Sequence, residues 1–165
     1  MGASTAVVSA EVINQALDRL GAALEALDAE GTADCFAEDA EMVQLHGTFR
    51  GRDAIRGFFA WSFALATDVH FEERGFGRHV APPFVYLEAV ESLTMTDGTT
   101  YSVPLLGFGE FNASGQITRW VRSSDRWSIV VQGARQMSGP LGVYFRWFLH
   151  QIDQSMTKGM PTPAS

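Results

Sequence analysis

The spacing of apolar positions in the first third of the chain is helical. Apolar residues recur every third or fourth position from Ile13 to Leu27, which predicts an amphipathic helix with Ser9 as its N-cap. Gly31 is expected to stop this helix, because glycine favours the backbone conformation that ends helices. Thr32 is then expected to cap a short second helix over Ala33–Ala37.

Further along the chain the apolar period changes to two, which predicts strands. The expected strands cover residues 41–46, 69–76, 84–95, 99–111 and 116–130. Asp97-Gly98 and residues 112–115 are typical of hairpin turns. Pro104 falls inside a strand and indicates an edge or a bulge. Helices followed by an antiparallel meander define an α+β layout.

Two more helices complete the pattern. The segment Asp53–Phe63 presents an apolar side that includes Phe58 and Phe59. A final helix is expected to begin at Ser138-Gly139-Pro140, because proline suits the first helical turn. Its residues 141–152 are apolar on two sides, so this helix is expected either to cover a pocket or to pair with a second subunit in a homodimer.

Composition narrows the class of protein. The chain has 165 residues, 46% of them apolar and only 19% charged, with a formal charge of −7. The acidic balance argues against nucleic acid and anionic membranes as partners. The single cysteine, Cys35, cannot form an intrachain disulfide or a cysteine-based zinc site. The apolar surplus must be buried in a core, a ligand cavity or a subunit interface.

The chain shows no signal for targeting or for a cofactor. No apolar run approaches the roughly 20 residues of a membrane span, and no phosphate-binding loop or zinc motif occurs. We therefore expect one soluble, cytoplasmic domain over residues 1–165, without metal or cofactor. Residues 1–8 and 158–165 are expected to be flexible.

Three segments carry a family resemblance: FAEDAEMVQLHGTFRGRDAIRGFF (Phe36–Phe59), LEAVESL (Leu87–Leu93) and LLGFGEFNASGQITRW (Leu105–Trp120). They resemble polyketide cyclases of the SnoaL type and limonene-epoxide hydrolases, both of the nuclear-transport-factor-2-like superfamily. The resemblance covers roughly Leu17–Asp125. It implies a cone, in which three N-terminal helices wrap a curved mixed sheet around a deep apolar pocket, often in a dimer.

Strand parity and the resemblance together select the residues that face the pocket. The epoxide-hydrolase pattern, with its inward Tyr and Asn, Arg-x-Asp pair and Trp-x-Asp pair, maps onto Met42 and Gln44, onto Ala89 and Glu91, and onto Trp120 and Arg122. The same parity turns inward His46, Tyr101, Val103, Leu105 and Ser124, and helical spacing adds Phe58 and Phe59.

The hydrolase pattern needs two acids that flank an arginine, whereas this sequence keeps one acid, Glu91, and places its arginine, Arg122, on another strand. In an apolar cavity the two side chains would pair, because neither charge is tolerable alone there. Glu91 is then a candidate base or acceptor and Arg122 a candidate carbonyl-binding group. His46 could transfer a proton, and Tyr101 could donate a hydrogen bond to an oxyanion.

Together with the resemblance to polyketide cyclases, these residues favour a cofactor-independent cyclase or isomerase of natural-product biosynthesis, which closes a ring in a large apolar, polyketide-like substrate. Orientation in a shaped pocket could promote an aldol reaction, an epoxide opening or an intramolecular cycloaddition. A hydrolase in which Glu91 activates water is the first alternative. A non-catalytic ligand-binding or dimerisation module is the second.

Overall fold

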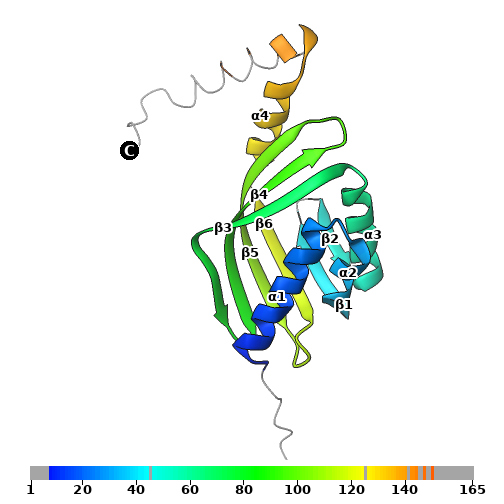
Figure 1. Ribbon diagram of the computed structural model, residues 1–165, viewed down its shortest axis with the longest axis vertical. Coiled ribbons are helices and arrows are strands. Elements are labelled where there is room, and N and C mark those ends of the chain that lie inside the picture. Colours follow the sequence, from blue (N-terminus) through cyan, green and yellow to red (C-terminus); the bar gives the residue numbers. More distant parts are fainter. Residues whose placement is uncertain are drawn as a thin grey trace, which may run out of the picture.

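The computed structural model describes residues 8–44, 46–124, 126–140, 142–144, 147 and 150, without the side chains of 126–129 and 134 (Figure 1). The helices are α1 (Ala10–Glu25), α2 (Ala29–Asp34), α3 (Arg52–Phe63) and α4 (Arg126–Gln136). The strands are β1 (Phe36–Gln44), β2 (Gly47–Arg50), β3 (Ala66–Ala81), β4 (Phe84–Met95), β5 (Thr100–Phe111) and β6 (Ile117–Ser124).

The strands form one curled, unclosed sheet in the order β2-β1-β6-β5-β4-β3. Strands β3 to β6 are the predicted antiparallel meander, whereas β1 pairs with β6 in parallel and makes the sheet mixed. Helix α1 crosses the sheet, and α2 and α3 lie together beside β1 and β2 (Figure 1). The predicted α+β cone with three N-terminal helices is thus confirmed.

The junction between the first two helices differs from the prediction. Helix α1 ends at Glu25, and Leu27 adopts a left-handed conformation with φ 54°. The cap of α2 is Asp28 rather than Thr32, because the Asp28 carboxylate accepts from the Gly31 amide at 3.0 Å. Gly31 therefore does not stop a helix but lies inside α2, where a Cβ would overlap the Asp28 carboxylate.

Strand β3 is longer than predicted and is interrupted by a bulge. It runs from Ala66 to Ala81, and its register with β4 shifts between Glu73 and Arg78. Gly75 and Gly77 lie in this bulge with φ values of 56° and 61°, a conformation that other residues rarely adopt. These glycines bend the strand, and the bend brings Arg78 toward α1.

The predicted strand over 116–130 is wrong in its second half. Strand β6 ends at Ser124, and α4 begins at Arg126. Strand β6 pairs with β5 only from Leu105 onward, so the first part of β5 is a free edge on that side. Pro104 lies in this part, which confirms its prediction as an edge residue.

Side chains of α4 occupy this free edge. Gln132 Oε1 accepts from the Ser102 amide at 2.8 Å, and Gln132 Nε2 donates to the Ser102 carbonyl at 2.8 Å. Gln136 bonds the amide and the carbonyl of Thr100 in the same way. Two glutamines one helical turn apart thus replace the strand that β5 lacks here.

The chain beyond α4 is helical at the described positions between 139 and 150, in agreement with a helix that begins near Pro140. Most of its predicted apolar stripe lies outside the described residues, but Val143, Tyr144 and Trp147 are each more than half exposed. Residues 1–7 and 158–165, expected to be flexible, also lie outside, and Val8 is buried in the core. No helix in the described part of the chain is long and apolar enough to cross a membrane.

Candidate functional site

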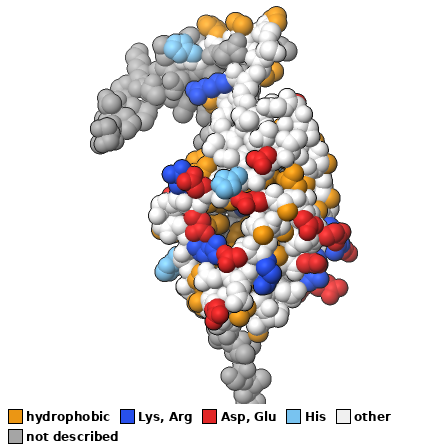
Figure 2. Space-filling model, viewed as in Figure 1, with side chains coloured by type: hydrophobic (Ala, Val, Ile, Leu, Met, Phe, Trp, Pro, Cys, Tyr) orange, Lys and Arg blue, Asp and Glu red, His pale blue; other side chains and the backbone are white. Residues whose placement is uncertain are grey.

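A cavity of about 720 Å³ lies between α1, α3 and the concave face of the sheet. Its walls are mainly apolar: Leu17, Leu20 and Leu24 from α1, Phe58 and Phe59 from α3, and Ala89, Val103, Leu105 and Trp120 from the sheet. The face that carries α1 and β3 is hollowed, and charged side chains gather around the hollow (Figure 2). A cavity of this size accommodates a ligand of drug-like dimensions.

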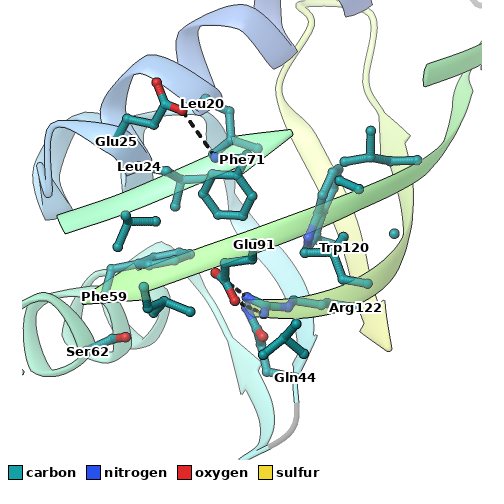
Figure 3. A pocket seen from close by; sticks show the side chains of 18 of the residues that line it. Leu20, Leu24, Glu25, Gln44, Phe59, Ser62, Phe71, Glu91, Trp120 and Arg122 are labelled. Atoms are coloured by element: carbon teal, nitrogen blue, oxygen red, sulfur yellow. Dashed lines mark hydrogen bonds and ion pairs between the residues drawn. The ribbon is translucent and has the colours of Figure 1, made fainter. Parts of the chain in front are cut away.

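One buried ion pair interrupts the apolar wall (Figure 3). Glu91 on β4 is 6% exposed and holds Arg122 on β6 end-on, with Nη1 of Arg122 2.9 Å from Oε1 of Glu91 and Nη2 in contact with Oε2. The pairing predicted from the sequence is confirmed. Because both side chains extend from inward-facing positions, the guanidinium lies across β5 and faces the cavity.

Trp120 forms part of the wall because β5 lacks side chains beneath it. A Cβ added at Gly109 would lie 2.7 Å from Cζ3 of Trp120 and 2.9 Å from Cγ1 of Val85. At Gly107 the closest approach to the indole would be 3.5 Å. The glycines of the segment LLGFGEF therefore allow the indole to lie close against the strand.

The other predicted residues are distributed around this centre. Gln44 lines the cavity beside the ion pair (Figure 3), and its Nε2 is 3.5 Å from Sδ of Met42. His46 is exposed in a turn, with its ring 5.4 Å from that of Trp61. Tyr101 lines the cavity near α4, where its hydroxyl would lie 3.1 Å from a Cβ at Gly133.

Two residues predicted to bind substrate do not line the cavity. Met42 is fully buried in the core that α1, α3 and the sheet share. Ser124 is the last residue of β6 and is only half-buried. Both have the predicted parity, but the helices fill the space over Met42, and the cavity does not extend to the end of β6.

The sequence did not indicate the charged residues at the cavity mouth. Arg78, which follows the β3 bulge, donates from Nη1 to Asp18 of α1 at 2.7 Å and from Nε to Glu73 at 2.9 Å. Burial lowers the pKa of Arg78, but the hydrogen bond to Asp18 and the charge of Glu73 outweigh it and raise that pKa above its ordinary value. The bulge glycines were the signal that could have marked this position.

A second contact joins α1 to β3. Oε1 of Glu25 accepts from the Phe71 amide at 3.2 Å and lies 2.8 Å from Nδ1 of His70 (Figure 3). Glu25 and Asp18 therefore hold α1 to the edge strand at two points, and both residues line the cavity. Among the described residues, no group of three His, Cys, Asp or Glu side chains could hold a metal ion.

Comparison with known proteins identifies the class. Residues 17–120 match the SnoaL-like domain family, and the chain belongs to this family. No curated protein sequence matches the chain.

Solved structures share the fold. A candidate SnoaL-like polyketide cyclase from Shewanella denitrificans OS-217 aligns with a TM-score of 0.68 at 15% identity, over 76% of this chain and 98% of that one. An LEH-like epoxide hydrolase of M. tuberculosis aligns with a TM-score of 0.61 at 16% identity, over 74% and 89%. A protein with a ketosteroid isomerase-like fold from Catenulispora acidiphila DSM 44928, in complex with trimethylamine, gives 0.64 at 23% identity, over 72% and 91%. At these identities the likenesses establish the fold, which is nuclear-transport-factor-2-like.

Proposed function

We propose that this protein is a cofactor-independent cyclase or isomerase that closes a ring in a large, apolar, polyketide-like substrate. The observation that carries the proposal is a cavity of about 720 Å³ with mainly apolar walls and one bidentate Glu91–Arg122 pair. Such a cavity can hold a flexible substrate in a folded conformation with its reacting atoms close together. The entropy lost in reaching this conformation is a large part of the barrier to cyclisation.

Arg122 is the group that we expect to act on the substrate. A guanidinium has five N–H donors, and the end-on contact with Glu91 uses two of them. The others can bind a substrate carbonyl and stabilise the negative charge that develops there during ring closure. Glu91 acts here as a positioning residue, because its carboxylate fixes the orientation of the guanidinium.

Gln44 and Tyr101 are secondary donors in this mechanism. Both line the cavity, and the amide of Gln44 lies beside the ion pair (Figure 3). A second polar contact would fix one end of the substrate while the apolar wall determines how the rest folds. His46 is exposed at the mouth, where it could exchange protons with solvent.

A hydrolase in which Glu91 activates water is the second candidate, and the resemblance in fold to the LEH-like epoxide hydrolase supports it. Incubation of the protein with epoxide-bearing polyketide substrates in ¹⁸O-labelled water separates the two functions. A cyclase gives an isomeric product of unchanged mass, whereas a hydrolase gives a product that contains one heavy oxygen. The second result would replace the cyclase proposal.

Substitution of the ion pair tests the assigned roles. We expect Arg122→Gln to lower kcat about a hundredfold, because it removes the charged donors, and Glu91→Gln to lower kcat less, since an amide oxygen can still hold the guanidinium. Glu41→Gln is the matched control, because Glu41 pairs with Arg50 at 3.0 Å outside the cavity. Unchanged turnover in both cavity variants, with the fold retained, would instead favour a non-catalytic binding module.

A further inference from the structure

The charges that line the cavity are unevenly compensated. Its acidic lining residues are Asp18, Glu25, Glu73 and Glu91, and its basic ones are Arg78 and Arg122. The lining therefore has four acidic and two basic side chains, which give these six residues a formal charge of −2. The whole chain carries −7, so the rest of the protein does not supply a compensating positive field.

Both lining arginines are already compensated in charge by carboxylates. Arg122 is held by both carboxylate oxygens of Glu91. Arg78 is held between Asp18 at 2.7 Å and Glu73 at 2.9 Å, and its side chain is only 24% exposed. The remaining N–H groups of Arg122 can still donate to a neutral carbonyl, but an anionic ligand would meet no uncompensated positive charge and would lie beside the acidic residues, which is unfavourable.

The acidic side chains stand where a ligand would pass. Asp18, Glu25 and Glu73 lie on the two elements, α1 and β3, that border the hollow seen in Figure 2. Glu25 is fixed there by the Phe71 amide at 3.2 Å and by His70. A fixed carboxylate at an opening repels like charge over several ångströms, and neighbouring low-dielectric walls strengthen this effect.

We propose that the cavity discriminates against anionic ligands, and that Asp18, Glu25 and Glu73 are the residues that exclude carboxylates, sulfonates and phosphates. This inference rests on the proposed function only in naming its substrate class: a neutral, apolar molecule with an acceptor oxygen for Arg122. A substrate with an anionic group on the part that enters the cavity would bind poorly. The preceding reaction must therefore supply a substrate without negative charge on this part.

Two fluorescent probes that differ by one charged group test the selection. N-phenyl-1-naphthylamine is neutral, and 1-anilinonaphthalene-8-sulfonate has the same ring system with one sulfonate. Titrations at low salt should give about tenfold weaker binding of the sulfonate. Because the acidic side chains are partly exposed, the difference should narrow at high salt.

Variants of Asp18, Glu25 and Glu73 test whether these residues cause the difference in affinity between the two probes. Asp18→Asn combined with Glu73→Gln frees Arg78 and should strengthen sulfonate binding about fivefold or more, with the neutral probe unchanged. Glu25→Gln keeps an acceptor for the Phe71 amide and should give a smaller gain of the same sign. Glu72→Gln is the matched control, because Glu72 lies on the same strand, pairs with Arg74 at 2.6 Å and does not line the cavity.

The outcomes separate this inference from the proposed function. Equal affinity for the two probes in the wild-type protein, or unchanged sulfonate affinity in the folded variants, overturns the charge selection and leaves the cyclase proposal standing. Failure of the neutral probe to bind at all overturns both proposals, because the cavity would then not accept an apolar ligand of this size. Probe binding requires no turnover, so a catalytically inactive protein can still confirm the selection.

Discussion

Trp120 packs against β5 at two glycines, Gly107 and Gly109, whose side chains are single hydrogen atoms. Gly107 and Gly109 both lie beneath the indole, but a methyl group would have 3.5 Å to the indole at Gly107 and only 2.7 Å at Gly109. The second distance is well inside van der Waals contact, and Val85 closes the other side at 2.9 Å. The two glycines of one short motif therefore differ in how strictly they are required.

We expect Gly109→Ala to destabilise the protein by about 1–3 kcal/mol, because the indole or β4 must shift to admit the methyl group. Gly107→Ala is the matched control and should cost less than about 1 kcal/mol. Urea unfolding followed by tryptophan fluorescence measures both free energies. Equal effects at the two positions would contradict the packing described here.

Cys35 shows how burial affects a single titratable group. Its side chain is partly buried, and its Sγ donates to the Gly31 carbonyl at 3.4 Å. Burial raises the pKa of the Cys35 thiol. The nearby positive charge of Arg19 lowers this pKa by a smaller amount, and the negative charge of Asp34 raises it further. The folded state thus favours the neutral thiol, which contributes stability at pH values below the unfolded-state pKa and loses it as the pH rises through the folded-state pKa.

Iodoacetamide should therefore alkylate Cys35 in the folded protein more slowly than in the urea-unfolded protein at pH 8, since the thiolate is the reactive form. The folded protein should need a more alkaline pH to reach half of its maximal rate. Mass spectrometry of the time course gives both pH profiles. Superimposable profiles would show that burial does not control this thiol.

At the scale of residues, parity was a reliable guide where both neighbours of a strand were predictable. Glu91 and Arg122 were predicted to pair because both face an apolar pocket where neither charge is tolerable alone, and the two strands that carry them do lie on either side of β5 in the meander. Parity indicates the face of the sheet on which a side chain lies. It does not indicate whether a helix packs directly against that side chain or leaves a cavity over it. For this reason Met42 was predicted to face the ligand, although it is buried in the core.

At the scale of elements, α4 was the main error of the sequence analysis. The run Trp127-Ser-Ile-Val-Val131 is rich in β-branched residues, which favour strands locally. The chain turns away from the sheet after Ser124, however, and the free edge of β5 is bonded by Gln132 and Gln136 instead. A pairing between side-chain amides and a strand edge leaves no periodic signal in the sequence.

Replacement of both glutamines by alanine should release α4 from the sheet, because four hydrogen bonds to the backbone of Ser102 and Thr100 disappear. Hydrogen–deuterium exchange of the Ser102 and Thr100 amides should become at least about tenfold faster, which corresponds to about 1.4 kcal/mol of local opening. Arg135→Ala, an exposed change on the same helix, should leave these rates unchanged. Slow exchange in the double variant would show that other contacts hold α4.

At the scale of the whole molecule, the fold and the cavity could be predicted, but the borders of the cavity could not. The apolar stripe of α1 was predicted as one face of an amphipathic helix, and its residues Leu17, Leu20 and Leu24 line the cavity. The curvature of the sheet determines whether the apolar face of α1 packs against other side chains or lines a cavity. The β3 bulge increases this curvature. The predicted homodimer stays a prediction, which sedimentation at micromolar concentration can test.

Gly21 offers a direct test of the cavity, because it lines the cavity from α1 and a Cβ there would meet no atom within 4 Å. We expect Gly21→Phe to weaken binding of the neutral naphthylamine probe about tenfold by occupying part of the space. The melting temperature should not fall, since glycine is a poor helix former. Gly57→Phe is the matched control on α3, with an equally open position that does not line the cavity. Equal probe affinity in the two variants would place the ligand elsewhere.

The glutamine contacts of α4 also bear on how the protein behaves in concentrated solution. A strand edge with free amides and carbonyls recruits strands from other molecules. Here the other edges of the sheet are a strand of four residues, β2, and a bulged, highly charged strand, β3. The first part of β5 contains Pro104, which donates no backbone hydrogen bond, and Gln132 and Gln136 cover the backbone groups of Ser102 and Thr100. A chain shortened after Ser124 would keep most of its cavity wall but would be expected to aggregate, so α4 contributes to solubility as well as to the fold.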